Sequence, residues 1–327
     1  MTATDTRAVH WGFLGAGFVA ARAVGPAVHA SAYAQLQAVG ARDTERASAL
    51  EPRGLAVDDY QAVLEDESVE AVYISLTNEA HLRWITAAIT AGKHVLCEKP
   101  ITLNAKECRE AFSCARSAGL LLVEAAWTQW HPRTRRADAL VTAGDLGEVR
   151  RIDASFTFDG VPTGNYRLDP SRGGGSLLDV GPYLLRPAVT WVHEDWTVNA
   201  VSRTASEVGT DLRTNATLTT ATGAKAEVLS SFVDPEHQDL QIHGSSAAIR
   251  FGSPAITSWR EVANIEITDG VRRWSESFPA CDAYELMVSS VSRRIRGDSD
   301  AYVTTEEETV DCMSLIDLID DACAGAA

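Results

Sequence analysis

Short runs of strand-forming residues alternate with helical patterns over the first 124 residues of the chain. The runs are AVHWGFL (8–14), QLQAVGA (35–41), LAV (55–57), AVYISL (71–76), HVLC (94–97) and LLLVE (120–124). Alternation of this kind is typical of βαβ units, whose strands lie parallel in one sheet. The pattern therefore predicts an α/β domain with a doubly wound parallel sheet.

One helix of this half is bounded clearly. Asn104 can cap its first turn while Glu107 reaches back in a capping box, and Gly119 follows its last turn. Its apolar residues recur at helical spacing, as expected for a helix that covers a sheet.

From about Glu148 the pattern changes to longer strand-like runs, which predict a second, largely antiparallel sheet. These runs are VRRIDASFTF (149–158), TNATLTTA (214–221), AKAEVLSSFV (224–233) and DLQIHGS (239–245). The segment GGGSLLDVGPYLL (173–185) reads as a loop that opens into a helix, and the stretches 282–296 and 304–325 read as helices. The second half is therefore expected to be an α+β domain with a large open sheet.

The chain has 327 residues, which predicts two domains because a domain usually holds about 100 to 200 residues. We place a dinucleotide-binding domain at 1–125 and a substrate-binding and oligomerisation domain at 126–327.

The composition narrows the choice of partner. With 45 acidic and 29 basic residues the formal net charge is −16, which repels nucleic acid and favours a neutral sugar or diol over a strongly anionic substrate. No run of about 18 apolar residues and no signal-peptide pattern is present, so we expect a cytoplasmic protein that does not enter a membrane. The six cysteines form no CxxC pair, and no HxxxH pair occurs, so reduced thiols and no metal site are expected.

The segment GFLGAGFVA (12–20) directly follows the first strand and opens a helix. Gly15 and Gly17 would let the backbone turn and approach a pyrophosphate, which would meet the free N–H groups of the helix start at Phe18 and Val19. This context predicts a Rossmann domain that binds a dinucleotide. The alternative is a set of glycines in an ordinary βα turn.

Arginines follow the second strand, where the adenosine ribose of a dinucleotide is read. Arg42 and Arg46 can pair with the ribose phosphate of NADP, whereas Asp43 suits the ribose hydroxyls of NAD. We expect the cofactor to be NADP, with NAD as the alternative cofactor. Arg42 could instead be a solvated surface residue with no role in binding.

Polar residues also follow the later strands at the edge where doubly wound sheets bind ligands. They are Thr77, Asn78 and His81 after the fourth strand, Glu98 and Lys99 after the fifth, and the stretch 124–131 after the sixth. We expect Thr77, Asn78, His81, Glu98 and Lys99 to line one crevice with the cofactor. His81 could instead make a structural hydrogen bond at a helix start.

Three motifs make the chain similar to the glucose-fructose oxidoreductase and inositol dehydrogenase family (Gfo/Idh/MocA). They are GFLGAGFVA, AGKHVLCEKP (91–100) and GGGSLLDVGPY (173–183), in the order and spacing of that family. The resemblance implies that Lys99 is the catalytic lysine, that Pro100 shapes the turn near the nicotinamide, and that the protein is a homodimer or homotetramer through the open face of its second sheet.

Within the family, EAAWTQWHP (124–132) and Tyr183 resemble the branch of dimeric dihydrodiol dehydrogenase and NADP-dependent D-xylose dehydrogenase. Inositol dehydrogenases commonly carry histidine where Tyr183 stands. Gln129 is a departure, because that branch usually has arginine there.

Hydride transfer between nicotinamide and a secondary alcohol or ketone also needs a group that takes or gives the proton. Lys99 and Tyr183 are the candidates, as a coupled pair. Asp179 lies one helical turn before Tyr183 and shares its face, so both could meet the substrate, although a capping aspartate and a core tyrosine are the alternatives. Arg167 could bind substrate oxygens or hold its loop by a salt bridge, and Trp127 could wall the pocket or belong to the core.

The same fold also serves NAD-dependent glycosidases and non-catalytic regulators that bind NAD(P), so both remain alternatives. The intact Glu98-Lys99-Pro100 motif together with Tyr183 argues against a regulator.

Overall fold

The computed structural model describes residues 7–325, which divide into two compact units. The first unit contains the described residues up to 102, together with 106–130 and 282–309. The second contains 103–105, 131–281 and the described residues from 310 onward.

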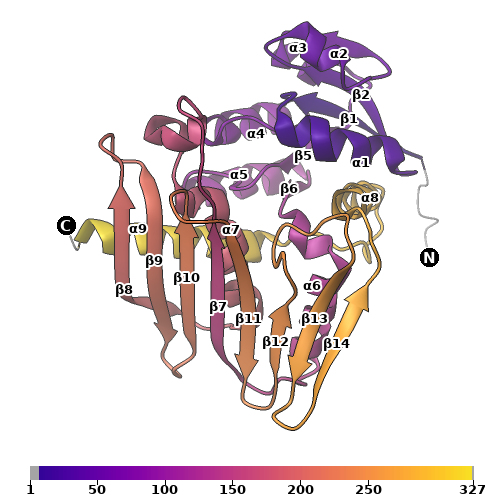
Figure 1. The fold of residues 1–327 in the computed structure, drawn as a ribbon. Coiled ribbons are helices and arrows are strands. Elements are labelled where there is room, and N and C mark those ends of the chain that lie inside the picture. Colours follow the sequence, from indigo (N-terminus) through magenta and orange to yellow (C-terminus); the bar gives the residue numbers. More distant parts are fainter. Residues whose placement is uncertain (1–6, 326–327) are drawn as a thin grey trace. The chain divides into compact units, whose positions relative to one another are not determined.

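The first unit is built on a six-stranded sheet with the strand order β3-β2-β1-β4-β5-β6 (Figure 1). All neighbouring strands are parallel. The strands are β1 (Val9–Leu14), β2 (Ala34–Gly40), β3 (Leu55–Val57), β4 (Ala71–Ile74), β5 (His94–Cys97) and β6 (Leu122–Glu124). This is the strand order of a Rossmann domain, and it confirms the parallel sheet that the sequence predicts.

Helices connect these strands. They are α1 (Gly25–Ala30), α2 (Thr44–Ser48), α3 (Tyr60–Glu65), α4 (His81–Thr90) and α5 (Ala105–Ala118). The bounds of α5 agree with the predicted helix, and Gly119 follows it in the left-handed conformation (φ 67°).

A π-helix at Ala20–Val24, which no pattern in the sequence predicts, precedes α1. The N–H of Gly25 donates to the carbonyl of Ala20, which is the wide spacing of a π-helix. A Cβ at Gly25 would lie 2.8 Å from that carbonyl oxygen and 2.7 Å from Leu50 Cδ2. Glycine therefore permits the wide turn directly behind the glycine motif.

The chain returns to the first unit through α8 (Ala283–Ile295), which packs on α1 and β2. Its buried face contains Met287, Val288 and Val291, which need an apolar partner. A hydrogen bond also joins α8 to β1, because the indole Nε1 of Trp11 donates to Ser292 Oγ at 3.1 Å. A single boundary after residue 125 does not include this return, because contacts distant in sequence leave no local signal.

The second unit contains an eight-stranded sheet with the order β14-β13-β12-β11-β7-β10-β9-β8 (Figure 1). The strands are β7 (Val149–Thr157), β8 (Trp196–Ala205), β9 (Asp211–Thr220), β10 (Lys225–Ser231), β11 (His237–Gly244), β12 (Ala248–Phe251), β13 (Ala263–Thr268) and β14 (Arg273–Phe278). Every neighbouring pair is antiparallel except β7 and β10. The expectation of a largely antiparallel sheet is thus confirmed.

Four of these strands, β8 and β12 to β14, carry no run singled out in the sequence. Outward-facing positions of β13 are polar, and β14 is exposed at most of its positions. The exposed β14 lacks the apolar content that marks a strand in sequence, whereas β13 does alternate apolar and polar residues, a strand pattern that was not among the runs named above.

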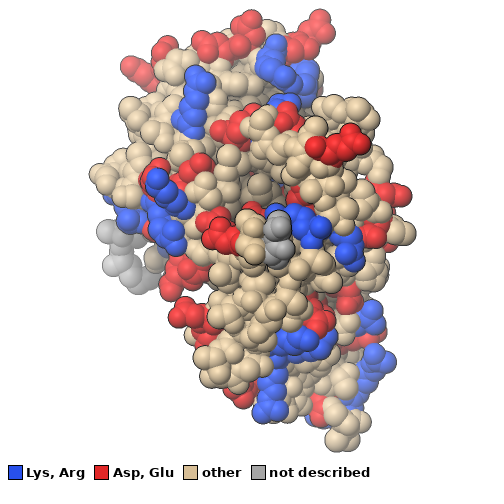
Figure 2. All heavy atoms as spheres, turned by 90° about the vertical axis from the view of Figure 1, so that its left-hand side faces the viewer, with Lys and Arg blue, Asp and Glu red and all other residues tan. Residues whose placement is uncertain are grey.

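The two faces of this sheet differ. Helices α6 (Pro132–Thr142) and α7 (Ser176–Trp191) pack on the apolar face, and α9 (Glu306–Gly325) runs along the same unit. The opposite face carries ion pairs, in which Arg151 contacts both Asp153 and Glu227 at 2.8 Å. Figure 2 shows basic and acidic side chains interspersed on the surface it presents.

Within residues 7–325, no helix combines the length and the apolar content that a membrane span requires.

We predict that Arg296 anchors the returning segment. Its guanidinium donates two hydrogen bonds of 2.7 Å to the Glu70 carboxylate and others to the carbonyls of Arg7 and Ala8. Partial burial would raise the pKa of Glu70, but hydrogen bonds from Arg296 and from the His10 N–H lower it below its usual value. Arg296→Ala should cost about 1 kcal/mol at neutral pH, because the pair is partly screened by water.

A carboxylate with a lowered pKa stabilises the fold above its unfolded value and loses that contribution as the pH falls through the folded value. The deficit of Arg296→Ala in urea unfolding should therefore shrink below about pH 4. Arg116→Ala, which removes an exposed partner of Glu306, serves as the control and should change little. A deficit that stays constant into acid would contradict this assignment.

Candidate active site

The glycine turn after β1 has the geometry that a dinucleotide requires. Gly15 adopts φ +108°, and a Cβ there would lie 2.3 Å from the Ser75 carbonyl oxygen, so the position demands glycine. A Cβ at Gly17 would find its nearest neighbour, Ser75 Oγ, at 3.5 Å, so the protein's own packing does not require a glycine there. Gly17 thus leaves room for close approach of a ligand at the point where Phe18 and Val19 begin a helix.

Two arginines lie near this turn. Arg46 Nη2 donates to the carbonyl of Ala16 at 2.6 Å. Burial raises the pKa of Tyr60, while the positive charges of Arg42 and Arg46 act to lower it, so both guanidinium groups stand near that ring. Two cations beside the glycine turn suit the additional phosphate of NADP.

Asp43, the residue that would favour NAD, caps α2. Its Oδ1 accepts a hydrogen bond of 2.8 Å from the N–H of Glu45. A carboxylate engaged in this way is less available to ribose hydroxyls, which further favours the phosphate-bearing cofactor.

Thr77, Asn78 and His81 follow β4. Thr77 donates from its hydroxyl to Glu79, and Asn78 is buried at the start of a short 3₁₀ helix. His81 is fully buried, with Nδ1 2.9 Å from the carbonyl oxygen of Pro100 and Nε2 3.2 Å from that of Leu76. This supports the structural interpretation of His81, and its contact with cofactor stays a prediction.

Lys99 lies in the turn after β5, where the Lys99–Pro100 peptide bond is cis. The Tyr73 hydroxyl donates to Glu98 Oε1 at 2.7 Å, and both side chains are buried. Beyond the lysine, the N–H of Ile101 donates to Glu124 Oε1 at 3.1 Å. With His81 on the Pro100 carbonyl, buried side chains from three neighbouring elements hydrogen-bond to the residues that flank Lys99: Tyr73 to the Glu98 side chain, and His81 and Glu124 to the backbone.

Burial raises the pKa of Glu98, against the hydrogen bond from Tyr73 and the positive charge of Lys99, which lower it. Glu98 was expected to bind cofactor, and its burial against Tyr73 instead favours a role within the protein. The sequence offered one sign of this pair, since a tyrosine in an apolar strand needs a partner for its hydroxyl. Its cofactor contact stays a prediction.

The short helix after β6 (Trp127–Trp130) is packed into the first unit. Trp127 is only 4% exposed and stacks on Tyr284, with ring centroids 5.1 Å apart. Gln129 is buried as well, and the indole of Trp130 donates to the carbonyl of Tyr302. These contacts favour the core interpretation of Trp127.

In the second unit, the glycine-rich segment brings a loop close to the start of α7. Gly173 and Gly175 have positive φ values of 74° and 134°. A Cβ at Gly174 would lie 2.6 Å from the carbonyl oxygens of Tyr166 and Arg167, so no side chain fits there. The glycines therefore let the loop 165–175 fold tightly on itself directly before the helix.

This packing places Arg167 beside Asp179, with Arg167 Nε 2.8 Å from Asp179 Oδ2. Burial alone would lower the pKa of Arg167, but the Asp179 carboxylate outweighs it and raises the pKa above its usual value. Asp179 and Tyr183 stand one turn apart on α7, as the sequence predicts. The Tyr183 ring lies 6.3 Å from that of Phe156, in a row that continues to Phe158.

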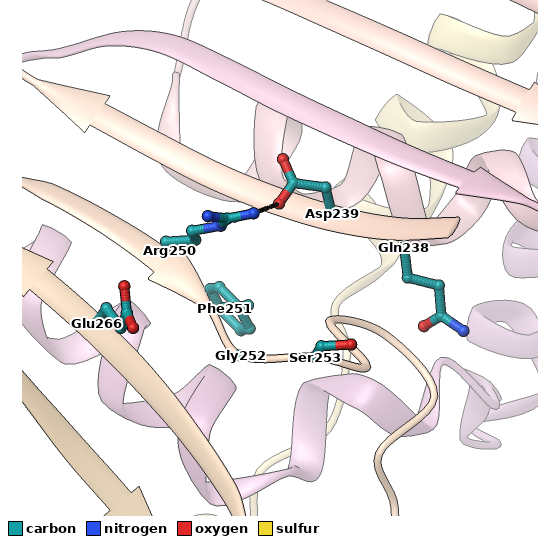
Figure 3. Close-up of a pocket in the computed structure, with 7 residues that line it drawn as sticks. All are labelled: Gln238, Asp239, Arg250, Phe251, Gly252, Ser253 and Glu266. Carbon is teal, nitrogen blue, oxygen red and sulfur yellow. Dashed lines mark hydrogen bonds and ion pairs between the residues drawn. The ribbon is translucent and has the colours of Figure 1, made fainter. Parts of the chain in front are cut away.

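Figure 3 shows a hollow elsewhere on the second sheet. It has a volume of about 220 Å³ and is lined by Gln238, Asp239, Arg250, Phe251, Gly252, Ser253 and Glu266. Arg250 closes on Asp239 at 3.2 Å, and no predicted site residue lines it.

Among residues 7–325, no three His, Cys, Asp or Glu side chains gather as a metal site. The six cysteines carry thiols.

Comparison with known proteins places these features in a family. A model described as an oxidoreductase family with an NAD-binding Rossmann fold matches residues 9–125, and the Gfo/Idh/MocA C-terminal domain matches residues 134–250. D-xylose 1-dehydrogenase (NADP(+)) 2 of Haloferax volcanii is 35% identical over 97% of this chain and 98% of its own length. Trans-1,2-dihydrobenzene-1,2-diol dehydrogenase of Sus scrofa is 34% identical over 55% of this chain and 54% of its own.

Among solved structures, a 3-ketoreductase from Actinomadura kijaniata in complex with NADP and TDP-benzene has a TM-score of 0.87 at 28% identity, and the match covers 96% of this chain and 98% of that one. The chain belongs to the Gfo/Idh/MocA oxidoreductase family, which confirms the resemblance inferred from its motifs.

We predict that Tyr73→Phe destabilises the first unit through Glu98. Loss of the hydroxyl leaves a buried carboxylate without its donor, which should cost about 1–3 kcal/mol at neutral pH. A carboxyl whose folded pKa is raised favours the fold at low pH and loses that advantage as the pH rises. The deficit should therefore be largest at pH values where Glu98 is ionised and should shrink as the pH falls through its folded pKa, which lies above the usual glutamate value of about 4.3. Chemical unfolding across this range measures it.

Tyr33→Phe, at a partly exposed tyrosine, is the matched control and should be nearly neutral. Equal stability of Tyr73→Phe and wild type at pH 7 would show that the Tyr73–Glu98 bond contributes nothing.

Proposed function

We propose that this protein transfers a hydride between NADP and a secondary alcohol or ketone of a sugar, polyol or diol. The observation that carries the proposal is the Lys99 turn, held by buried side chains at the same sheet edge as the glycine turn. The relatives named above act, by their names, on D-xylose, on a dihydrobenzene diol and on a keto group, two of them with NADP.

The residues around the glycine turn fit NADP. Gly15 and Gly17 admit the pyrophosphate to the helix start at Phe18, and Arg42 and Arg46 supply positive charge for the ribose phosphate. When bound, NADP supplies the site that gives or receives the hydride.

The matching proton leaves or reaches the substrate oxygen, and we assign it to Lys99 with Tyr183. Solved variants of the Actinomadura kijaniata 3-ketoreductase replace one lysine by alanine and one tyrosine by phenylalanine. Those two residues are separated by the same number of positions as Lys99 and Tyr183, which supports the assignment. The two groups would titrate as a coupled pair.

The second unit offers groups for a neutral, polyhydroxylated substrate. Asp179 and Arg167 can accept from and donate to hydroxyl groups, and the rings of Tyr183 and Phe156 can contact C–H faces. With a net charge of −16, the protein repels strongly anionic substrates, whereas a neutral sugar or diol meets no such repulsion.

We further propose a cytoplasmic homodimer or homotetramer that associates through the polar face of the second sheet. Cysteines present as thiols suit a reducing compartment. An open eight-stranded sheet otherwise leaves that face to water.

A screen of aldoses, inositols, diols and keto sugars with both cofactors tests the function directly. Net change in nicotinamide absorbance on one of these substrates supports it. An NAD-dependent glycosidase would release product without net change in absorbance, and a regulator would bind cofactor without turnover; either result would refute the proposal.

Lys99→Ala should lower turnover by about 10² to 10⁴, the usual contribution of general acid/base catalysis, while cofactor still binds. Tyr183→Phe should cost as much only if tyrosine is the terminal proton donor. Steady-state kinetics and NADPH titration measure both. Lys106→Ala, at an exposed lysine of α5, is the control. Retention of more than about a tenth of wild-type turnover by Lys99→Ala would exclude this role.

Arg42→Ala should weaken NADP binding by roughly tenfold and leave NAD binding nearly unchanged, because only NADP carries the phosphate that the guanidinium pairs with. Titration with each reduced cofactor measures the effect, with the exposed Arg53→Ala as control. Equal losses for both cofactors, or tighter wild-type binding of NAD, would overturn the preference.

A further inference from the structure

Helix α7 carries two of the proposed substrate residues but has no cap of its own. Its N-cap is Gly175, which has no side chain to accept a hydrogen bond from the first turn. The first N–H groups of a helix have no acceptor within the helix, and leaving them without a hydrogen bond is costly where water is excluded. Ser176 and Leu177, in the first turn of α7, are buried. Some other residue must therefore satisfy them.

That residue is Asp211, which is distant in sequence, at the start of β9. Its Oδ2 accepts hydrogen bonds from the N–H of Leu177 at 2.8 Å and from the hydroxyl of Ser176 at 2.9 Å. A Cβ at Gly175 would come 3.3 Å from the Asp211 Cβ. A larger N-cap residue would crowd the carboxylate, so Gly175 and Asp211 fit each other.

Asp211 is itself fixed from the other side. Its Oδ1 accepts from the Thr214 hydroxyl at 2.7 Å and lies 3.6 Å from Arg203 Nε. Arg203 donates to Thr214 at 2.8 Å and to Asp320 of α9 at 2.6 Å. Both carboxylate oxygens are therefore held, Oδ2 by the first turn of α7 and Oδ1 by Thr214 and Arg203, and Arg203 is in turn held by Asp320.

Thr210, the residue before Asp211, holds the loop that precedes α7. The Thr210 hydroxyl donates to the carbonyl of Leu168 at 2.7 Å. That loop also contains Arg167, the partner of Asp179. The start of β9 thus holds both sides of the Arg167–Asp179 pair.

We propose that Asp211 is a positioning residue for catalysis: by capping α7 from β9, it sets the first turn of that helix and with it the placement of Asp179 and Tyr183. The proposal rests on the proposed function of Asp179 and Tyr183. A misplacement of about 1 Å at a reacting group can cost about 10²-fold in rate, so loss of the cap should appear in catalysis.

The test compares Asp211→Ala with Asp211→Asn and with Asp234→Ala. Asparagine keeps an oxygen that can accept from Leu177, whereas alanine does not. Asp234 pairs with Arg213, also of β9, at 2.9 Å but does not contact α7, so it is the matched control. Steady-state kinetics on the substrate found in the screen, NADPH titration and hydrogen exchange of the amides of 176–180 are measured for each.

We expect Asp211→Ala to lower kcat/KM by about tenfold or more, with NADPH affinity unchanged and faster exchange at 176–180. Asp211→Asn should recover most of the catalysis, and Asp234→Ala should match wild type. Unchanged kcat/KM in Asp211→Ala, equal losses in Asp234→Ala, or unaltered exchange at 176–180 would each overturn the proposal.

If Asp211→Ala does not fold, Thr214→Val decides, because it removes the hydroxyl that holds Oδ1 and leaves the carboxylate. A fall in kcat/KM of about threefold or more with unchanged NADPH affinity supports the proposal, and wild-type kinetics refute it. Absence of any nicotinamide turnover in the wild type would refute the proposed function alone, since hydrogen exchange still reports whether Asp211 fixes the helix.

Discussion

The need to satisfy buried polar groups at the ends of parallel strands governs the arrangement around Lys99. The turn after β5 is enclosed between β4, α4 and β6, so its backbone has little access to water. His81 and Glu124 supply hydrogen bonds to the backbone of Pro100 and Ile101, and Tyr73 supplies one to the buried Glu98 carboxyl, each from a different element. The Glu98 carboxyl that Tyr73 meets and the Pro100 carbonyl that His81 meets would each be costly to bury without a hydrogen bond. The lysine is thereby attached to a turn whose flanking residues are held by hydrogen bonds from three elements.

In the second unit, too, buried hydrogen bonds hold the segment that carries proposed site residues. There the fixed element is a helix whose first turn is capped by a strand distant in sequence, and the charge of Asp211 is balanced by Arg203. In both units, buried polar side chains hydrogen-bond to the segment that carries a proposed catalytic or substrate-binding group. Motif analysis does not detect such residues.

The parts that could be predicted are those with local causes. Strand-forming runs, the capping box at Asn104 and the glycines of GFLGAGFVA act through neighbouring residues, so the parallel sheet, α5 and the glycine turn followed from the sequence. The return of α8 and the pairing of Asp211 with α7 depend on contacts over 34 or more positions, which leave no periodic signal. The Tyr73–Glu98 pair could be predicted only in part. A tyrosine in an apolar strand requires a partner for its hydroxyl, but only the structure identifies that partner as Glu98. The roles of individual site residues remain predictions.

The parallel pairing of β7 and β10 inside an otherwise antiparallel sheet has a consequence for how such proteins diversify. Parallel neighbours require a long crossover, and here the crossover is the whole stretch 158–224. It contains Arg167, Asp179, Tyr183 and Asp211, together with the hairpin β8–β9 that forms the sheet edge. The groups of the second unit that are proposed to meet substrate, and the residue that caps their helix, therefore lie in one contiguous segment. Recombination at the two ends of that segment would exchange these groups and leave the nucleotide-binding sheet unchanged, provided that the new segment brings a strand that pairs with β10 as β9 does.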